Sequence, residues 1–298
     1  MFTATVRDRG LSPMTAELTP ITAADLPAVA EFLRVNHDDR VPWAASCTAP
    51  WRQVDTPNLG YQLRDGGHVV GTLLALYSER VVAGRAERFC NIGTWCVLPD
   101  YRAQSIPLVK ALLAQDGYHF TVLSPNAGPQ EILAWLKFRF LDTSAVLIPN
   151  LPLPSLPGRT TISGDPGVIE QTLTGSDRAL YRDHARALAA RHLVLTRGGQ
   201  YCYVMYREFR HKSLLGYAMI LHISNAELFH RSRIPLTRFL LLRRGLVATL
   251  AELRVLGRSP VPTAMALALT NRPKMYRSTS LDPTQIDYLY SELACVPW

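Results

Sequence analysis

The sequence predicts an α/β protein with mixed sheets, built as two units in tandem. Strand-like and helix-like segments alternate along the 298 residues, which is typical of this fold class. A strand, a double-glycine turn and a second strand occur in the first half and again in the second. The stretch Ile148–Gly167 is rich in proline, which suits neither a sheet interior nor a helix interior. We therefore expect a first unit at 1–148, a linker at 149–168 and a second, more divergent unit at 169–298.

The first unit begins with a short strand and a helix in the stretch LTPITAADLPAVAEFLRVNHD. Thr22 and Asp25 have the spacing of a capping box at the start of that helix. Asp65-Gly66-Gly67 predicts a hairpin turn between two strands, and Gly84 predicts a second turn before a third strand. A helix from about Ile106 follows. Three further segments are expected, a strand in HFTVLSP, a helix in GPQEILAWLKF and a final strand in RFLDTSAVLI.

The second unit repeats part of this order. The stretch LVLTRGGQYCYVMYREFRHK is similar to YQLRDGGHVVGTLLALYSER, and both have a glycine pair between two strand-like runs. Ile-Pro-Leu opens an apolar helix in each unit, at 106–108 and at 234–236. The stretch IPLTRFLLLRRGLVATLAELRVLG reads as helix-like throughout, and TAMALALTNRPKMYRS takes the place of HFTVLSPNAGPQ. We interpret this similarity as a tandem duplication.

Composition limits the possible partners and compartment. The formal net charge of +8 favours an anionic partner. No helix-turn-helix, RNA-binding motif or zinc finger is visible, so we do not expect nucleic acid. Five cysteines at irregular spacing argue against a disulfide framework and favour a reducing cytoplasm. The most apolar helix-like stretch contains several arginines, so no membrane span is expected, and no histidine spacing predicts a metal site.

The first unit resembles the GNAT superfamily of acyl-CoA N-acyltransferases. The resemblance is carried by TWCVLPDYRAQSIPLVKALL and TVLSPNAGPQEILAWLKF, whose order and spacing follow the family over roughly residues 17–148. The matching positions are Val97, Pro99, Tyr101, Arg102, Asn126, Leu136 and Phe138. The resemblance implies a mixed sheet, acetyl-CoA or another acyl-CoA as donor, and a small-molecule amine as acceptor.

The resemblance also implies a phosphate-binding turn at the start of the helix. The backbone amides of a helix N-terminus bind the pyrophosphate of CoA, and glycines allow close approach. Here Ala103, Ser105 and Pro107 replace the family's glycines, so the expected cradle is narrower than usual. The expected cofactor-binding positions are Val97, Arg102, Ala103, Gln104, Ser105, Ile106 and Asn126.

The catalytic positions that the resemblance implies depart further from the family. The amide of Val97 would polarise the thioester oxygen. Some members carry a glutamate six residues earlier as a base; here that position is Asn91, which cannot take a proton. Glu87 is the nearest acidic substitute. Leu133 stands where many members have a tyrosine that protonates the leaving thiolate, so Ser124 is the remaining candidate donor.

Two other functions stay open at this level. Autoinducer synthases and N-acyl amino acid synthases have a related fold and take acyl groups from acyl carrier protein, a donor that depends less on a pyrophosphate site. A non-catalytic binding module would fit the asparagine, leucine and proline found where the family has functional residues. Donor choice in a thiol-release assay and calorimetric titration of CoA would distinguish these cases.

Overall fold

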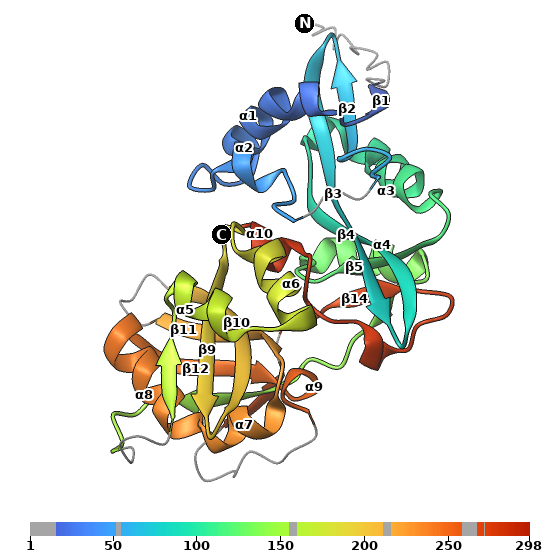
Figure 1. The fold of residues 1–298 in the computed structure, drawn as a ribbon. Helices are drawn as coiled ribbons and strands as arrows, with labels where there is room; N and C mark the ends of the chain where they lie inside the picture. Colours follow the sequence, from blue (N-terminus) through green and yellow to red (C-terminus); the bar gives the residue numbers. More distant parts are fainter. Residues whose placement is uncertain (1–15, 52–54, 155–159, 211–215, 258–266, 271) are drawn as a thin grey trace, which may run out of the picture.

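Two seven-stranded mixed sheets organise the chain. The computed structural model describes residues 16–51, 55–154, 160–210, 216–257, 267–270 and 272–298. The first sheet has the strand order β1-β2-β3-β4-β5-β14-β6, and the second has the order β13-β7-β12-β11-β10-β9-β8. Figure 1 shows the two sheets as two lobes of one molecule, with the C-terminal segment between them. The mixed α/β class is confirmed.

The first sheet is antiparallel except where β4 meets β5. Gly66 and Gly67 join β2 to β3 with φ values of 53° and 83°, the left-handed conformation that such a hairpin needs. Ala83 and Gly84 make the next turn in the same way, at φ values of 50° and 82°. The strands are β1 (Glu17–Pro20), β2 (Gly60–Asp65), β3 (His68–Val82), β4 (Arg85–Val97), β5 (Tyr118–Val122), β6 (Arg139–Phe140) and β14 (Met275–Arg277).

Helices cover both faces of the first sheet. They are η1 (Ala23–Asp25), α1 (Leu26–Asn36), α2 (Trp43–Ser46), η2 (Pro99–Gln104), α3 (Ser105–Leu113) and α4 (Ala127–Trp135). Leu73 and Tyr77 of β3 are buried in the core that α3 and α4 cover, while Leu74 and Leu76 are buried in the core that α1 covers. This alternation is the period of two of a strand buried on both faces. The expected capping box at Thr22 is present.

The second sheet repeats the order of the first. The hairpin of β9 and β10 turns at residues 198–199, β11 follows, and α8 crosses to β12, which pairs parallel to β11. In the first sheet, β2, β3, β4, α3 and β5 have the same arrangement. The elements are β7 (Ser144–Pro149), β8 (Thr161–Ser163), α5 (Pro166–Thr172), α6 (Gly175–His184), β9 (Ala190–Arg197), β10 (Gln200–Arg210), β11 (Gly216–Ile223), α7 (Ala226–Arg231), α8 (Arg233–Arg244), β12 (Leu246–Glu252), α9 (Leu253–Leu256) and β13 (Leu267–Thr270).

One long helix was expected where the structure has a helix, a strand and a short helix. Gly245 ends α8 in the left-handed conformation with φ of 68°, a common helix C-terminus. The next residues, Leu246–Glu252, form β12, so β12 rather than the stretch around β13 corresponds to β5. Periodicity alone could not separate a short apolar strand from a helix here.

The two sheets exchange strands. The segment expected as one final strand of the first unit splits into β6, which stays in the first sheet, and β7, which pairs with β12 and β13 in the second. In return, β14 lies between β5 and β6 of the first sheet. The expected linker also contains β8 and the start of α5. Sheet membership therefore does not follow the expected boundaries, because residues 144–148 and 275–277 each pair in the other half's sheet.

The exchange gives the halves a common core. Phe89 and Leu123 of the first half are buried in one cluster with Tyr203 and Met219 of the second. After β14 the chain forms η4 (Pro283–Gln285) and α10 (Glu292–Cys295) along this boundary. Figure 1 shows this red segment lying against both lobes.

Candidate functional site

The parallel strands β4 and β5 separate part of the way along their length. Their pairing runs from Arg88 with Tyr118 to Asn91 with Thr121 and then ends, although β4 continues to Val97. A bulge in β4 lies just beyond, because Leu73 pairs with Trp95 while Ala75 pairs with Ile92. We call the gap between the diverging ends of β4 and β5 the fork.

The free edge of β4 faces the fork at Val97. The Leu98 amide donates to the Val70 carbonyl of β3 at 2.9 Å. Because successive amides of a strand point to opposite edges, the amide and carbonyl of Val97 point away from β3 and toward the fork. The Val97 backbone therefore faces the fork, although Val97 is not among the residues that line the cavity described next. Its contact with a thioester stays a prediction.

A cavity of about 170 Å³ occupies the fork. The end of β4 contributes Trp95, and the loop after β5 contributes Ser124 and Asn126, the latter at the N-terminus of α4. Among the described residues, the lining is His37, Ile92, Gly93, Thr94, Trp95, Val122, Ser124, Pro125, Asn126, Pro129, Leu133, Arg272 and Trp298. The structure therefore brings Ser124 and Asn126 to one cavity, whose lining also includes His37, Arg272 and Trp298. The catalytic and binding roles expected for Ser124 and Asn126 stay predictions.

The expected phosphate cradle is not a free row of amides. Pro99–Gln104 forms a 3-10 helix, whose amides bond to carbonyls three residues earlier. The Ser105 amide donates to the Arg102 carbonyl, and the Ser105 hydroxyl donates to the same oxygen at 2.7 Å. The expectation that the Ser105 amide is free was therefore wrong. Without glycines, this segment winds tightly into the helix instead of opening as a loop.

The remaining cradle positions lie at the surface or contact other parts of the chain. Arg102 and Ala103 are exposed, and Ile106 is half-buried in the first turn of α3. The side-chain carbonyl of Gln104 accepts a hydrogen bond from the Ala16 amide at 3.0 Å. Their binding role stays a prediction.

Asn91 is buried where the fork begins, and its amide group is engaged on both sides. The Asn91 Nδ2 group donates to Thr121 Oγ1 at 3.0 Å, and Asn91 Oδ1 accepts from the Glu292 amide at 2.8 Å. Asn91 therefore anchors α10 at the point where β4 and β5 part. Asn91 is not among the described residues that line the fork cavity.

Glu292 places a buried carboxylate at the same point. Its Oε1 accepts from the Leu123 amide at 2.9 Å and from the Ser124 hydroxyl at 3.0 Å, and its side chain is 1% exposed. Its Oε2 has no hydrogen-bond partner among the described residues. Burial raises the pKa of Glu292 above its ordinary value, and the hydrogen bonds to the carboxylate offset part of that shift.

Glu87 lies away from the fork. Its carboxylate is 3.0 Å from Nε2 of His119, whose Nδ1 is 2.9 Å from the Ser278 hydroxyl. The Ser278 oxygen also accepts the amides of Ser280 and Leu281, so this serine caps a turn in the C-terminal segment. Glu87 does not line the fork cavity, because it precedes the last paired residue of β4 by four positions.

Arg207 holds the C-terminal segment beside the fork. This buried β10 residue donates to three main-chain carbonyls, those of Leu293, Val296 and Trp298, at 3.1, 3.3 and 3.4 Å. Its guanidinium carbon also lies 5.6 Å from the centroid of the Trp298 ring. Burial lowers the pKa of Arg207 to about 10, while the charge of Glu292 acts in the opposite direction. The second half thus positions Trp298, which lines the fork cavity.

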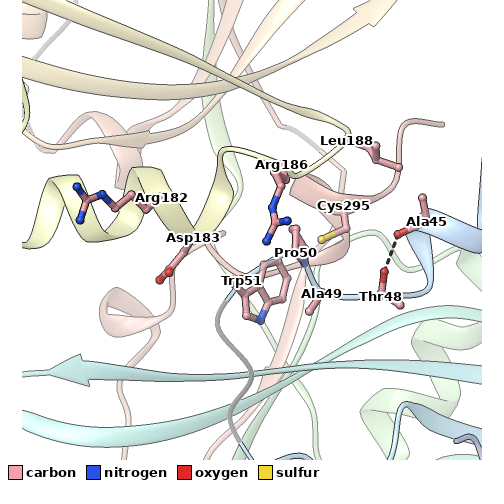
Figure 2. A pocket seen from close by; sticks show the side chains of 10 residues that line it. All are labelled: Ala45, Thr48, Ala49, Pro50, Trp51, Arg182, Asp183, Arg186, Leu188 and Cys295. Carbon is pink, nitrogen blue, oxygen red and sulfur yellow. Dashed lines mark hydrogen bonds between the residues drawn. The ribbon is translucent and has the colours of Figure 1, made fainter. Parts of the chain in front are cut away.

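A larger cavity of about 620 Å³ lies between the halves. Trp51 lies on one side, and Arg182 and Asp183 come from α6 on the other (Figure 2). Figure 2 shows the Arg186 guanidinium directed toward Trp51 and Pro50. The cavity therefore has a basic side and an aromatic floor.

Sequence reasoning missed His37, Glu292 and Arg207. No local motif marks them, and Glu292 is 201 residues from Asn91, whose side chain it contacts. The one available signal was the position of Glu292 beside apolar residues in the stretch SELACV. If such a stretch is buried, its charged residue needs a partner.

Among the residues that the structure describes, no helix is both long and apolar enough to cross a bilayer.

Solved structures of similar fold cover most of this chain. A GCN5-related N-acetyltransferase from Anabaena variabilis matches with a TM-score of 0.58 and 13% identity, over 88% of this chain and 72% of that chain. A probable N-acyltransferase from Enterococcus faecalis, a protein of unknown function, matches with a TM-score of 0.56 and 13% identity, over 90% and 74%. Saccharomyces cerevisiae N-myristoyltransferase, solved with myristoyl-CoA and inhibitors, matches with a TM-score of 0.53 and 12% identity, over 97% and 87%.

These similarities establish the fold. The chain has the GNAT fold over most of its length, in agreement with the sequence resemblance. No protein-family model matches the sequence. No curated protein matches it either.

Proposed function

We propose that this protein is an N-acyltransferase that moves an acyl group from a thioester to an amine. The fork is the observation that carries the proposal: β4 and β5 stop pairing at Asn91 and Thr121, and a cavity lies between their ends. An extended acyl-pantetheine arm can bond to the unpaired edge of β4. The Val97 amide then donates to the thioester oxygen, where negative charge develops during attack.

The donor that we favour is an acyl-CoA. The GNAT fold supports this choice, because two of the similar structures are an N-acetyltransferase and an N-myristoyltransferase with bound myristoyl-CoA. The net charge of +8 suits the phosphates of CoA. Arg272, an exposed residue that lines the fork cavity, and the exposed Arg102 carry the guanidinium groups that we assign to those phosphates.

The acceptor amine is proposed to enter from the cavity between the halves. Cys295 lines that cavity and Trp298 lines the fork cavity. Cys295 and Trp298 are three positions apart, so their Cα atoms are separated by at most about 10 Å. The two cavities are therefore lined by neighbouring residues of the C-terminal segment.

One observation favours a second candidate donor, an acyl group carried by acyl carrier protein. The 3-10 winding of Pro99–Gln104 and the bonded Ser105 amide leave fewer donors for a pyrophosphate. A carrier-protein donor has only the single phosphate of its phosphopantetheine arm, and it would rest on the basic surface of this protein.

Thiol release tests both donors. Acetyl-CoA, longer acyl-CoAs and acyl carrier protein loaded with the same acyl groups are each incubated with a panel of amines. Amine-dependent thiol release from acyl-CoA supports the first candidate, and release from the carrier protein alone supports the second. Heat on titration of CoA without any release would indicate a binding module, and neither heat nor release would refute the proposal.

Arg272→Ala provides the matched variant. Loss of one charge-assisted hydrogen bond raises the KM for acyl-CoA by about tenfold or more, since such a bond contributes about 1.5–3 kcal/mol. Arg40→Ala is the control, because Arg40 is exposed and pairs only with Asp38 among the described residues. An unchanged KM in the Arg272 variant would remove this residue from the proposed donor site.

A further inference from the structure

Amide formation from a thioester needs one group that takes up a proton and one that supplies a proton. When an amine attacks a thioester, the nitrogen must lose a proton and the leaving thiolate must gain one. Asn91 and Leu133, which stand where related enzymes have such groups, can do neither. The structure nonetheless places one carboxylate at this point, that of Glu292.

We propose that Glu292 and Ser124 form a proton relay that serves the fork, an inference that rests on the proposed acyltransferase function. Ser124 lines the fork cavity, and its hydroxyl donates to Glu292 Oε1 at 3.0 Å. The Glu292 amide is bonded to Asn91 Oδ1 at 2.8 Å. Glu292, 201 positions after Asn91 in the chain, thus places a carboxylate next to Asn91, whose own side chain cannot act as a base.

The proton transfers of this relay need no acid or base other than Ser124 and Glu292. As the amine attacks, its proton passes to the Ser124 oxygen while the Ser124 hydroxyl proton passes to the Glu292 carboxylate. The tetrahedral intermediate then collapses, the carbon–sulfur bond breaks, and the thiolate leaves. The same proton returns from Glu292 through Ser124 to the sulfur. The net products are an amide and a free thiol, and Glu292 is ionised again.

The surroundings of Glu292 suit a group that must both accept and release a proton. Full burial disfavours the charged form, as does an Oε2 that has no hydrogen-bond partner in the described part of the chain, whereas the Leu123 amide stabilises the charged form. The charged and titratable groups that face it are Arg207 from β10, Lys274 from the segment before β14, and Cys295 from its own helix. The positive charges of Arg207 and Lys274 favour the ionised carboxylate, whereas burial raises the pKa of Glu292.

His37 is the competing base. It also lines the fork cavity, and its ring centroid lies 5.5 Å from that of Trp43. Burial lowers the pKa of His37, and the nearby charge of Asp38 acts in the opposite direction. Glu292 is preferred because its carboxylate already accepts a hydrogen bond from Ser124, a residue that lines the cavity.

The test uses acetyl-CoA and the best amine of the panel. Glu292→Gln keeps the hydrogen-bond acceptor for Ser124 but cannot take a proton. We expect kcat to fall about 100-fold or more, with the KM for acetyl-CoA changed by less than about threefold. In the wild type we expect kcat to fall at acidic pH as Glu292 becomes protonated. The pH profile of the Glu292→Gln variant should lack this ionisation. Ser124→Ala should lose a similar factor, and the double variant should lose no more than either single one.

Matched variants separate the relay from a structural role. Glu227→Gln, at an exposed glutamate in α7, is the control and should match the wild type. If Glu292→Gln does not fold, Ser124→Ala still tests the relay through the same change in the pH profile. The inference is overturned if Glu292→Gln keeps kcat within about threefold, if the losses of the two single variants multiply, or if His37→Gln rather than Glu292→Gln removes the ionisation. Absence of amine-dependent release by the wild-type protein would instead refute the proposed function itself.

Discussion

Acidification should weaken the attachment of the C-terminal segment through His184. The His184 ring is fully buried; its Nδ1 donates to the Leu180 carbonyl at 2.9 Å, and its Nε2 accepts the Tyr290 amide at 3.0 Å. Protonation of Nε2 would break the bond to Tyr290. Burial is the main reason that the pKa of His184 falls from 6.5 to about 3.

The size and sign of the effect follow from that shift. A group whose folded pKa is lowered contributes stability above its unfolded value, and that stability is lost as the pH falls toward the folded value. At about pH 4.5 the unfolded histidine is protonated and the folded one is not, which amounts to about 3 kcal/mol. His192, whose pKa burial lowers to about 4, adds to the loss.

His184→Gln isolates this contribution, because glutamine can accept the Tyr290 amide but cannot be protonated. Urea unfolding at about pH 8 and about pH 4.5 is followed by tryptophan fluorescence, since the Trp51 ring lies 5.6 Å from the His184 ring. We expect the variant to lose about 3 kcal/mol less than the wild type between these pH values. His68→Gln, at an exposed histidine, should behave like the wild type. An equal loss in wild type and His184→Gln would refute the reasoning.

Two further substitutions test the fold. Lys274 and Glu252 form a buried ion pair, so Lys274→Met should lower the free energy of unfolding by about 3–5 kcal/mol. The double variant, Lys274→Met with Glu252→Gln, should recover most of that loss. A loss below about 1 kcal/mol in the single variant would contradict this expectation. A Cβ at Gly60, where φ is 119°, would lie 2.0 Å from the Leu73 carbonyl oxygen, so Gly60→Ala should cost about 3 kcal/mol or more by thermal unfolding. Gly128→Ala, at a helical glycine with open space around it, is the control and should be neutral or stabilising; equal behaviour of the two alanine variants would count against the predicted clash.

Local features were predictable because short stretches of sequence determine them. A glycine pair between strand-like runs adopts a two-residue turn wherever it occurs, and both such turns were predicted from Gly66-Gly67 and from the pair at 198–199. The resemblance to the GNAT superfamily came from the motif residues between Val97 and Phe138 together with the order of strands and helices around them. The same reasoning failed at β12, where a short apolar strand follows a helix after Gly245.

The proposed phosphate site shows where a family pattern misleads. The pattern placed the segment correctly at the start of α3, but it could not show how the backbone winds without glycines. The 3-10 turn at Pro99–Gln104 follows from local packing and dihedral preferences rather than from the motif.

The sequence by itself determined the glycine turns, helices α1, α3, α4 and α8, most strands of the two hairpin units and the strand that ends at Val97, because these depend on residues near one another in the chain. Tertiary structure alone decided that β7 and β14 change sheets and that Glu292 contacts Asn91 and Ser124. Such contacts join residues about 100 to 200 positions apart, and they form because a buried carboxylate and unpaired strand edges must find partners that no local pattern specifies.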